Sequence, residues 1–398
     1  MSKYGRVLGR AAAAAALALG SLLLGACAGE YPQTTFRPVS DFGRDLNQLF
    51  ANIFWLTMVV LVVVLAGVVY IILRFRERPG VPEPKRIYGN NLLELLWTLG
   101  PAVIVVLITV PTVRTIFQTY RSPREDALQV QAIGHQWWWE FRIPELGIRT
   151  ANQLYLPVGR EIDLHLSSVD VLHNWWVPRL GGKRYNYPNP VTPAGDEERP
   201  NHHRLIFTVD EPGVYAGQCA EYCGLSHALM QMRVVAVRAA EFEAWTTRMA
   251  TAAQPQPQAA EPSGLLDTIP GGEPQPETPV LAPALQATSP NVPAEGTLER
   301  RGHDIFMSRT CVACHAIAGT TAQGQLGPDL TNFGNRWAIG AGALPNAPEN
   351  IVRWVRRPER YKPGAQMPGT VFGGGGMPPT GLTRDELEAV AAYLYSLR

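Results

Sequence analysis

Two long apolar stretches constrain the fold of this 398-residue chain more than any other feature. Residues 46–73 and 95–113 contain no Asp, Glu, Lys or Arg. Each is close to the length of about 20 apolar residues that a transmembrane helix requires. We therefore expect a hairpin of two transmembrane helices, at residues 46–73 and 95–116.

The loop between these stretches indicates how the hairpin is oriented. It contains five basic and two acidic residues: Arg74, Arg76, Arg78, Lys85 and Arg86 against Glu77 and Glu83. Because loops rich in Lys and Arg stay in the cytoplasm, we expect the chain after residue 117 in the periplasm, on the outer face of a bacterial cytoplasmic membrane. Glu94, at the cytoplasmic end of the second helix, is either a boundary residue or the entrance of a proton path in a partner subunit.

The N-terminus has the pattern of an export signal. Basic residues at Lys3, Arg6 and Arg10 precede an uncharged run at residues 11–26. Residues 24–27, Leu-Gly-Ala-Cys, resemble the lipobox of bacterial lipoproteins, which implies cleavage after residue 26 and acylation of Cys27. Ordinary signal cleavage that leaves Cys27 as a free thiol is the alternative. Residues 27–45 would then form a periplasmic segment before the hairpin.

The exported part divides into a β-rich region, a linker and a helical region. Residues 117–249 contain runs of alternating apolar and polar residues, which predict an antiparallel β-sandwich. Residues 250–296 hold ten prolines and no Lys or Arg, which predicts a disordered linker. Residues 297–398 have helical spacing and predict a small all-α domain. The net charge of +1 gives no support to nucleic-acid binding.

One loop of the β-rich region gathers soft metal donors. These are Cys219, Cys223, His227 and Met230. Thiolate, imidazole and thioether donors favour copper, and two cysteines suggest thiolates that bridge two copper ions, each with a terminal histidine. For the second histidine, His173 follows a predicted strand, whereas His202 and His203 lie in a polar, proline-flanked loop. A zinc site or a disulfide is the alternative, and the methionine argues against zinc.

This loop resembles the dinuclear copper loop of cytochrome c oxidase subunit II. The resemblance extends back through Asp-Val-Leu-His at residues 170–173, Gly-His-Gln-Trp-Trp-Trp at 134–139 and Glu-Leu-Leu-Trp at 94–97, and so covers about residues 40–240. It implies that the β-rich region is a cupredoxin-like Greek-key sandwich. One departure is the loop at residues 187–203, which is longer than the family usually has.

The resemblance also implies roles for the matching residues. Cys219 and Cys223 would bridge the two metals of a copper A centre, with His173 and His227 as terminal ligands. The weaker ligands would be Met230 and the backbone carbonyl of Glu221, whose side chain would reach a magnesium ion shared with subunit I. Trp137 would be the aromatic residue at which electrons enter, and Glu94 would lie at the mouth of a proton path into subunit I.

The helical region carries a second redox motif. Residues 311–315 read Cys-Val-Ala-Cys-His, the attachment motif of c-type haem, in which Cys311 and Cys314 form thioethers and His315 binds the iron. A thioredoxin-like CxxC is disfavoured because His315 follows directly. The distal ligand is expected to be Met367, whose segment resembles the Tyr-x-Pro-Gly-x-x-Met segment of class I cytochromes c. Met377, in a Gly-rich turn, is the alternative.

Together the two motifs resemble subunit II of a caa-type haem–copper oxidase with a cytochrome c domain fused at its C-terminus. The resemblance implies that haem c passes electrons to copper A and on to subunit I, which reduces oxygen to water with proton translocation. Implied partners are subunits I and III, membrane lipid, and a donor such as a cytochrome bc complex or a cytochrome c. The alternatives are the copper A subunit of a nitric oxide reductase and a membrane-anchored electron carrier or copper-handling lipoprotein that acts alone.

Overall fold

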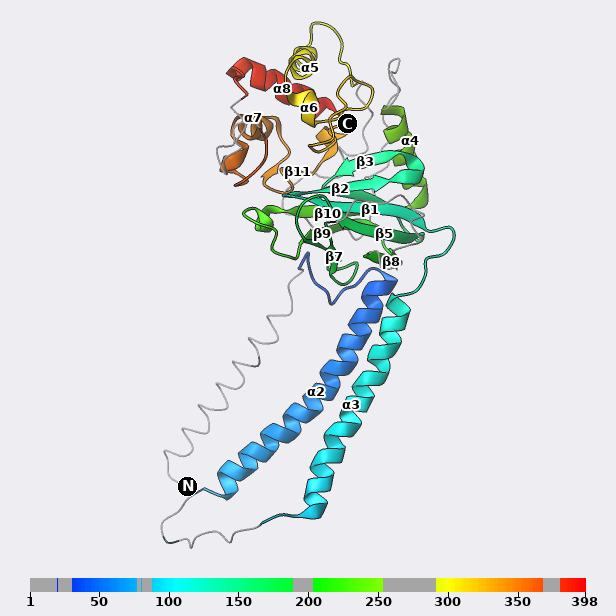
Figure 1. Ribbon diagram of the computed structural model, residues 1–398, viewed down its shortest axis with the longest axis vertical. Coiled ribbons are helices and arrows are strands. Elements are labelled where there is room, and N and C mark those ends of the chain that lie inside the picture. Colours follow the sequence, from blue (N-terminus) through cyan, green and yellow to red (C-terminus); the bar gives the residue numbers. More distant parts are fainter. Residues whose placement is uncertain are drawn as a thin grey trace.

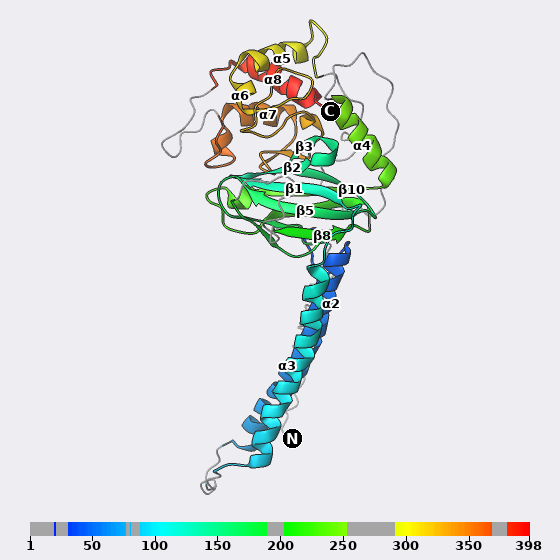
Figure 2. The same ribbon diagram turned by 45° about the vertical axis from the view of Figure 1, so that its right-hand side comes forward.

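The computed structural model stacks three parts along one axis (Figure 1). A helical hairpin lies at one end, a β-sandwich in the middle and a small helical domain at the other end, and both views agree on this order (Figure 2). The structure describes residues 31–76, 88–188, 203–252, 291–367 and 380–398, together with Gly20 and Gly80. The expected signal segment, Cys27, most of the cytoplasmic loop and most of the linker lie outside the described residues.

The hairpin consists of α2 (Asp41–Arg74) and α3 (Asn91–Thr119). Each helix begins several residues before its apolar stretch because a polar residue caps it. The Ser40 side chain accepts a hydrogen bond from the Gly43 amide, and the Asn90 side chain accepts one from the Leu93 amide. Both helices are long and apolar enough to span a membrane, and their apolar side chains are exposed.

The β-sandwich contains two five-stranded sheets. The first has the order β3-β2-β1-β5-β8 and the second β4-β10-β9-β6-β7. The strands of the first sheet are β1 (Leu128–His135), β2 (Trp138–Ile143), β3 (Ile148–Ala151), β5 (Glu161–Ser168) and β8 (Arg204–Thr208). Those of the second are β4 (Gln153–Pro157), β6 (His173–Trp176), β7 (Arg184–Asn186), β9 (Gly213–Cys219) and β10 (Gln231–Val237).

The expectation of a purely antiparallel sandwich is wrong. β1 pairs with β5, and β4 with β10, in parallel, while the other strand pairs are antiparallel. Alternating apolar and polar residues determine which face of a strand is buried, but they carry no information about strand direction. Direction is set by the connections, and here the chain visits other strands before it returns to pair in parallel.

The first sheet runs from the helical domain to the hairpin (Figure 1). At one edge, Arg149 of β3 donates a hydrogen bond to the Gln325 carbonyl of the helical domain over 3.4 Å. At the other, the Thr208 amide of β8 donates to Asp41 of α2 over 2.7 Å. Arg121, just after α3, pairs with both Asp41 and the buried Glu161. These contacts tie the sandwich to the hairpin on one side and to the helical domain on the other.

A helix that the sequence analysis did not anticipate packs against the sandwich. α4 (Ala239–Ala252) follows β10 directly and ends three residues beyond the boundary expected at residue 249. The Trp245 ring stacks on Tyr155 of β4, with 4.7 Å between ring centroids. Phe242, Trp245 and Met249 recur at helical spacing, so the signal for α4 was present in the sequence.

In the described residues 291–367 and 380–398, the helical domain packs four α-helices around a second core. They are α5 (Leu298–Ser308), α6 (Cys311–Cys314), α7 (Pro348–Arg356) and α8 (Arg384–Ser396). Between α6 and α7 the chain forms a small two-stranded sheet of β11 (Ala338–Ile339) and β12 (Leu344–Pro345). A capping box between Thr383 and Glu386 starts α8. The Tyr393 hydroxyl donates to the Asn291 carbonyl over 2.9 Å, so contacts with this domain begin within the segment expected as linker.

The crossing of α5 and α8 yields a stability prediction. A Cβ atom added at Gly302 would lie 1.9 Å from the Ala389 carbonyl oxygen, so Gly302→Ala must push the two helices apart. We expect a loss of about 3 kcal/mol from the opening free energy of these helices, measured by amide hydrogen exchange. The control is Arg301→Ala, at an exposed position of the same helix. Equal exchange rates in the two variants would contradict the prediction.

Candidate metal and haem sites

The soft donors gather where three strands of the second sheet meet. His173 begins β6, and Cys219 ends β9, where it pairs with Trp175 of β6. The loop of residues 220–230 then returns the chain to β10 at Gln231. Strand pairing therefore brings His173 to a cysteine 46 residues away, and the loop adds the remaining donors.

The donor atoms lie within a few ångströms of one another. The two sulfur atoms of Cys219 and Cys223 are 3.8 Å apart. His173 Nδ1 lies 3.8 Å from Cys219 Sγ, and His227 Nδ1 lies 3.6 Å from Cys223 Sγ. Each cysteine thus has one histidine beside it, as two metals bridged by two thiolates require.

Two weaker donors complete the cluster. Met230 Sδ lies 3.8 Å from Cys223 Sγ, and the Glu221 carbonyl oxygen lies 3.2 Å from Cys219 Sγ. Met230 is fully buried, while Glu221 is half-buried. Each cysteine sulfur therefore has one additional weak donor beside it, the Met230 thioether at Cys223 and the Glu221 carbonyl at Cys219.

The chemistry of this donor set fits copper. A hydrogen bond from the Cys223 thiol, with a further one from His173, lowers the pKa of Cys219 to about 4, so one thiolate forms readily. A second thiolate 3.8 Å from the first is opposed by like-charge repulsion in a buried site. A bound cation would offset that repulsion, and soft thiolate, thioether and imidazole donors would favour copper.

Asp170 orients His173, a contact that the sequence analysis did not assign. His173 Nε2 lies 2.9 Å from the Asp170 carboxylate, which leaves Nδ1 directed at Cys219. The same carboxylate accepts hydrogen bonds from the amides of Gln136 and Val171. A carboxylate on the second ring nitrogen fixes the orientation of a metal-binding histidine. The signal was available, since Asp170 precedes His173 by three residues.

Trp137 lies between the loop of residues 220–230, which we call the copper loop, and the helical domain. Its indole nitrogen donates to the Cys223 carbonyl over 2.9 Å, and the Gln136 side chain donates to the same oxygen over 2.7 Å. The far edge of the indole faces Gly364, where an added Cβ atom would lie only 2.5 Å from the ring. These two contacts leave Trp137 only 7% exposed. Trp137 therefore lies between a residue of the copper loop and the segment that carries Met367.

A buried carboxylate supports the turn that presents Trp137. Glu140 of β2 is 1% exposed and pairs with His135, Arg142 and Arg149 at 2.9, 2.6 and 2.6 Å. Burial alone would raise the pKa of Glu140, but the hydrogen bonds from His135 and Arg142 and the charge of Arg149 outweigh it and lower the pKa to about 2. The ionised carboxylate therefore stabilises the β1–β2 hairpin at neutral pH.

This network predicts a pH-dependent stability. Because the folded pKa of Glu140 lies below its ordinary value of 4.5, its contribution is complete above pH 4.5 and is lost as the pH falls towards 2. We expect Glu140→Gln to lower the opening free energy of the β1–β2 hairpin by about 3 kcal/mol at pH 7. The difference from wild type should shrink in that acidic window when amide exchange is followed. Glu211→Gln, at an exposed carboxylate, is the control, and an equal loss there would disprove the assignment.

The haem motif lies on α6 in the helical domain. Cys311 and Cys314 bound this single turn, and His315 follows it. His315 Nδ1 lies 2.8 Å from the Pro328 carbonyl oxygen, which assigns the ring proton to Nδ1 and leaves Nε2 free to bind iron. Burial lowers the pKa of His315, which favours the neutral ring that a metal needs.

The apolar surroundings of the motif also fit a haem. Several apolar side chains contact the core of the helical domain but are only half-buried: Cys311, Val312, Leu344, Trp354 and Met367. A porphyrin is a large apolar ring that would cover such side chains. Met367 lies in this group, on the same core cluster as Cys311. Met377, the alternative distal ligand, lies outside the described residues.

The other candidate residues lie away from these two sites. The His203 ring contacts Tyr187 at 4.3 Å between centroids, in the long loop, and His202 is outside the described residues. Glu94 lies in the first turn of α3, at the end of the hairpin farthest from the sandwich, and accepts a hydrogen bond from the Asn90 amide (Figure 1).

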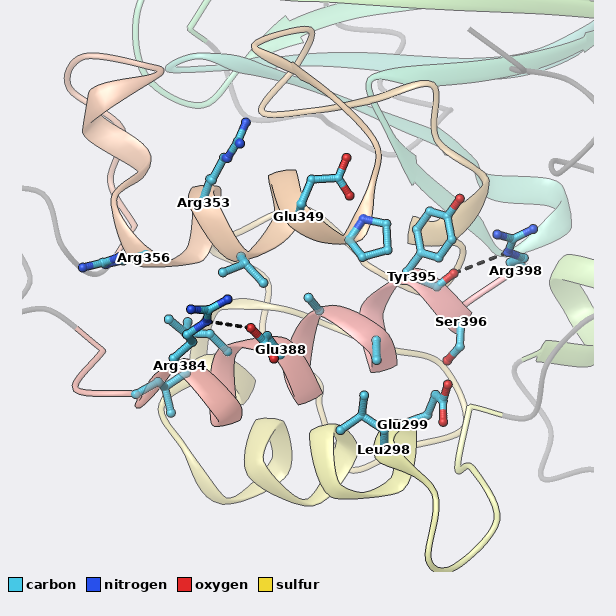
Figure 3. A pocket seen from close by; sticks show the side chains of 16 residues that line it. Leu298, Glu299, Glu349, Arg353, Arg356, Arg384, Glu388, Tyr395, Ser396 and Arg398 are labelled. Carbon is cyan, nitrogen blue, oxygen red and sulfur yellow. Dashed lines mark hydrogen bonds and ion pairs between the residues drawn. The ribbon is translucent and has the colours of Figure 1, made fainter.

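A surface cavity of 1020 Å³ lies between α5, α7 and α8 (Figure 3). Arginine and glutamate side chains border it, including the ion pair of Arg384 and Glu388 at 2.9 Å. Its lining contains neither the cysteines of α6 nor Met367, so it is separate from the haem motif.

Comparison with known proteins assigns all three parts of the chain. Residues 36–115 match the cytochrome c oxidase subunit II transmembrane domain, residues 145–237 its periplasmic domain, and residues 299–398 cytochrome c. Cytochrome c oxidase subunit 2 of Alkalihalophilus pseudofirmus is 32% identical over 387 residues, which are 95% of this chain and 94% of the relative. This chain belongs to the cytochrome c oxidase subunit 2 family. The predicted fold class of hairpin, cupredoxin-like sandwich and cytochrome c domain is thereby confirmed.

Other relatives extend the comparison. Cytochrome c oxidase subunit 2 of Bacillus subtilis is 30% identical over 405 residues, 96% of each chain. Quinol oxidase subunit 2 of Bacillus cereus is 29% identical over 230 residues, 56% of this chain and 75% of the relative. The solved periplasmic domain of oxidase subunit II from Bradyrhizobium japonicum matches 33% of this chain and 98% of its own length, with 23% identity and a TM-score of 0.29.

Family membership establishes the general role of this subunit 2 chain. It is an electron-transfer subunit of an oxidase, is anchored in a membrane, and associates with other oxidase subunits such as subunit I. Its cytochrome c domain and its cupredoxin-like domain accord with haem and copper as cofactors.

Proposed function

We propose that this subunit receives single electrons at a covalently bound haem c and delivers them through a dinuclear copper A centre to subunit I, where oxygen is reduced to water with proton translocation. The observation that supports this most directly is the position of Trp137. It bonds to the Cys223 carbonyl on one side and packs against Gly364, near Met367, on the other. One side chain thus links the two cofactor sites.

The chain's own residues hold and separate the two redox groups. Haem iron and the copper pair, when bound, each take up and release one electron at a time. His173, oriented by Asp170, and His227 would complete a copper pair bridged by Cys219 and Cys223. The haem of the cytochrome c domain would be held by Cys311, Cys314, His315 and Met367. Burial of Cys219, Cys223 and Trp137 keeps water from the copper end of the path between the sites.

Several further features belong to this proposal. The copper and cytochrome c domains lie in the periplasm, and the linker between them falls within residues 250–296, between the end of α4 and Asn291. Holding the two domains in one chain keeps the donor at high effective concentration near its acceptor. An acyl group on Cys27 would add a second membrane anchor. Glu221 would bind a magnesium ion shared with subunit I, and Glu94 would open a proton path into that subunit.

The partners follow from the same reasoning. Subunit I, with subunit III, would bind the hairpin, whose apolar side chains are exposed in the isolated chain. The external donor would be a cytochrome bc complex or a cytochrome c. Direct oxidation of a quinol, the activity in the name of the Bacillus cereus relative, is less well supported, because this chain keeps a complete set of copper donors and a cytochrome c domain.

The test is to purify the complex that contains this chain and to assay it with oxygen and with nitric oxide. We expect oxygen uptake, an electron paramagnetic resonance signal from one spin shared by two copper nuclei, and a low-spin c-type haem band. Reduction of nitric oxide without oxygen uptake would assign the chain to a nitric oxide reductase. Purification without any multispanning haem protein would instead indicate a carrier that acts alone.

A further inference from the structure

One lysine is buried where the cytochrome c domain meets the copper loop. Lys362 is 3% exposed, although lysine is almost never fully buried unless its ammonium group is paired. Its ammonium donates to the Leu229 carbonyl of the copper loop over 2.8 Å and to the Gly340 carbonyl of its own domain over 2.6 Å. The two acceptors belong to different domains, so this one group bridges them.

The backbone on both sides of Lys362 is shaped for this contact. Leu229 lies between His227 and Met230 in the copper loop. In the cytochrome c domain, residues 340–342 all adopt positive φ angles of 60°, 58° and 97°. This conformation lets the Ala341 carbonyl accept a hydrogen bond from the Gln231 amide over 3.0 Å, beside the Lys362 contact. We call Lys362, residues 340–342 and residues 229–231 the docking joint.

Further contacts extend the joint along the Met367 segment. The Ser226 hydroxyl donates to the Pro363 carbonyl over 2.6 Å, and Gly364 lies against Trp137. Residues 362–364 therefore touch the copper domain at three successive positions. The contacts of residues 362–364 begin five residues after Arg357 and end three residues before Met367. The docked position of this segment therefore also sets the position of Met367, the proposed distal ligand.

We propose that Lys362 is the latch that holds the cytochrome c domain on the copper loop in the orientation required for electron transfer. This inference rests on the proposed relay and adds a positioning residue to it. A buried ammonium with only two acceptors is costly, and an apolar side chain would fill the same space with less desolvation. A charged donor, however, makes docking depend on the Leu229 carbonyl being in place, which an apolar contact would not do.

Burial changes the pKa of Lys362. Removal from water lowers the pKa of Lys362 to about 7. The carbonyls of Leu229 and Gly340 satisfy two of the three donors of the ammonium. The two carbonyls therefore offset only part of what the charged group loses on leaving water.

The test compares Lys362→Met with Arg384→Met in the full chain within its complex. Both changes remove a basic nitrogen group from the cytochrome c domain, but Arg384 is 87% exposed and pairs within its own helix. The deciding measurement is exchange of the Gln231 amide, which is protected across the joint. We expect this exchange to rise about tenfold or more in Lys362→Met and to stay unchanged in Arg384→Met. Lys362→Gln, which keeps a neutral donor, should show a smaller rise.

Two further readouts separate this proposal from the relay itself. Unchanged copper and haem spectra establish that both sites remain folded, and the rate of electron transfer after photoreduction of the haem reports the relay. Faster Gln231 exchange with a slower transfer rate supports both proposals. Faster exchange with an unchanged rate supports the latch and overturns the relay through this docked state. Exchange equal to that of Arg384→Met, at any transfer rate, overturns the latch.

Discussion

Replacing Cys219 with serine is expected to abolish the dinuclear copper signal while leaving the haem band intact. Cys219 Sγ lies within 3.8 Å of Cys223 Sγ, His173 Nδ1 and the Glu221 carbonyl, so it contacts donors of both proposed metals. A serine hydroxyl is a harder donor and stays protonated at neutral pH. Loss of an indirect partner of a metal ligand lowers affinity about 10–100-fold, so loss of a bridging thiolate should lower copper affinity at least 100-fold.

The measurement is the electron paramagnetic resonance spectrum of copper-loaded Cys219→Ser, with copper content determined on the same sample. Tyr222→Phe is the matched control, because this exposed residue lies in the same loop and keeps the ring that contacts His227. The control should retain the wild-type spectrum. A dinuclear spectrum from Cys219→Ser would contradict the bridging role and would require another sulfur ligand.

Gly364→Ala is expected to slow electron transfer between the two sites about tenfold or more without removing either cofactor. The added Cβ would lie 2.5 Å from the Trp137 ring, so the cytochrome c domain must move away from the copper domain. Small misplacements of reacting groups are costly, with about 1 Å able to lower a rate about 100-fold. The rate is measured by photoreduction of the haem, followed by the optical change at the copper centre.

The control for this variant isolates contact from backbone strain. Gly364 has a φ of +82°, where any L side chain is strained, and Gly381 in the same domain has a φ of +67°. An added Cβ at Gly381 meets nothing within 4 Å. Gly381→Ala therefore carries a comparable strain but should keep the wild-type rate. If both variants slow transfer equally, the effect comes from strain and the Trp137 contact has no part in it.

These predictions converge on one short segment of the cytochrome c domain. Residues 361–367 supply the latch lysine, the glycine against Trp137 and the proposed distal haem ligand. A segment that both docks and ligates couples the geometry of the haem site to contact with the copper loop. Such coupling requires only that the segment have one rigid conformation, which the buried Lys362 and its two carbonyl acceptors favour.

The sequence by itself determined the features that depend on neighbours along the chain. Apolar runs of about 20 residues predicted the hairpin, and spacing within residues 219–230 and 311–315 predicted a copper loop and a haem motif. Helical spacing in residues 297–398 predicted a helical domain, and alternation predicted the strands of the sandwich. These signals are local because helix caps, strand faces and short ligand loops are formed by residues close in sequence.

Only the tertiary structure decided which distant residues meet. Trp137 reaches Cys223 across 86 residues, and Lys362 reaches Leu229 across 133. His173 and Cys219 were already expected in one site from the family resemblance, and strand pairing supplies their contact across 46 residues. Parallel pairing of β1 with β5 and the packing of α4 on the sandwich were likewise beyond local pattern. The physical reason is that such contacts are selected by how whole sheets and domains pack. From the sequence alone, a lysine such as Lys362 is expected to be a solvated surface charge. Only the packing of the two domains places two carbonyls around it and excludes water.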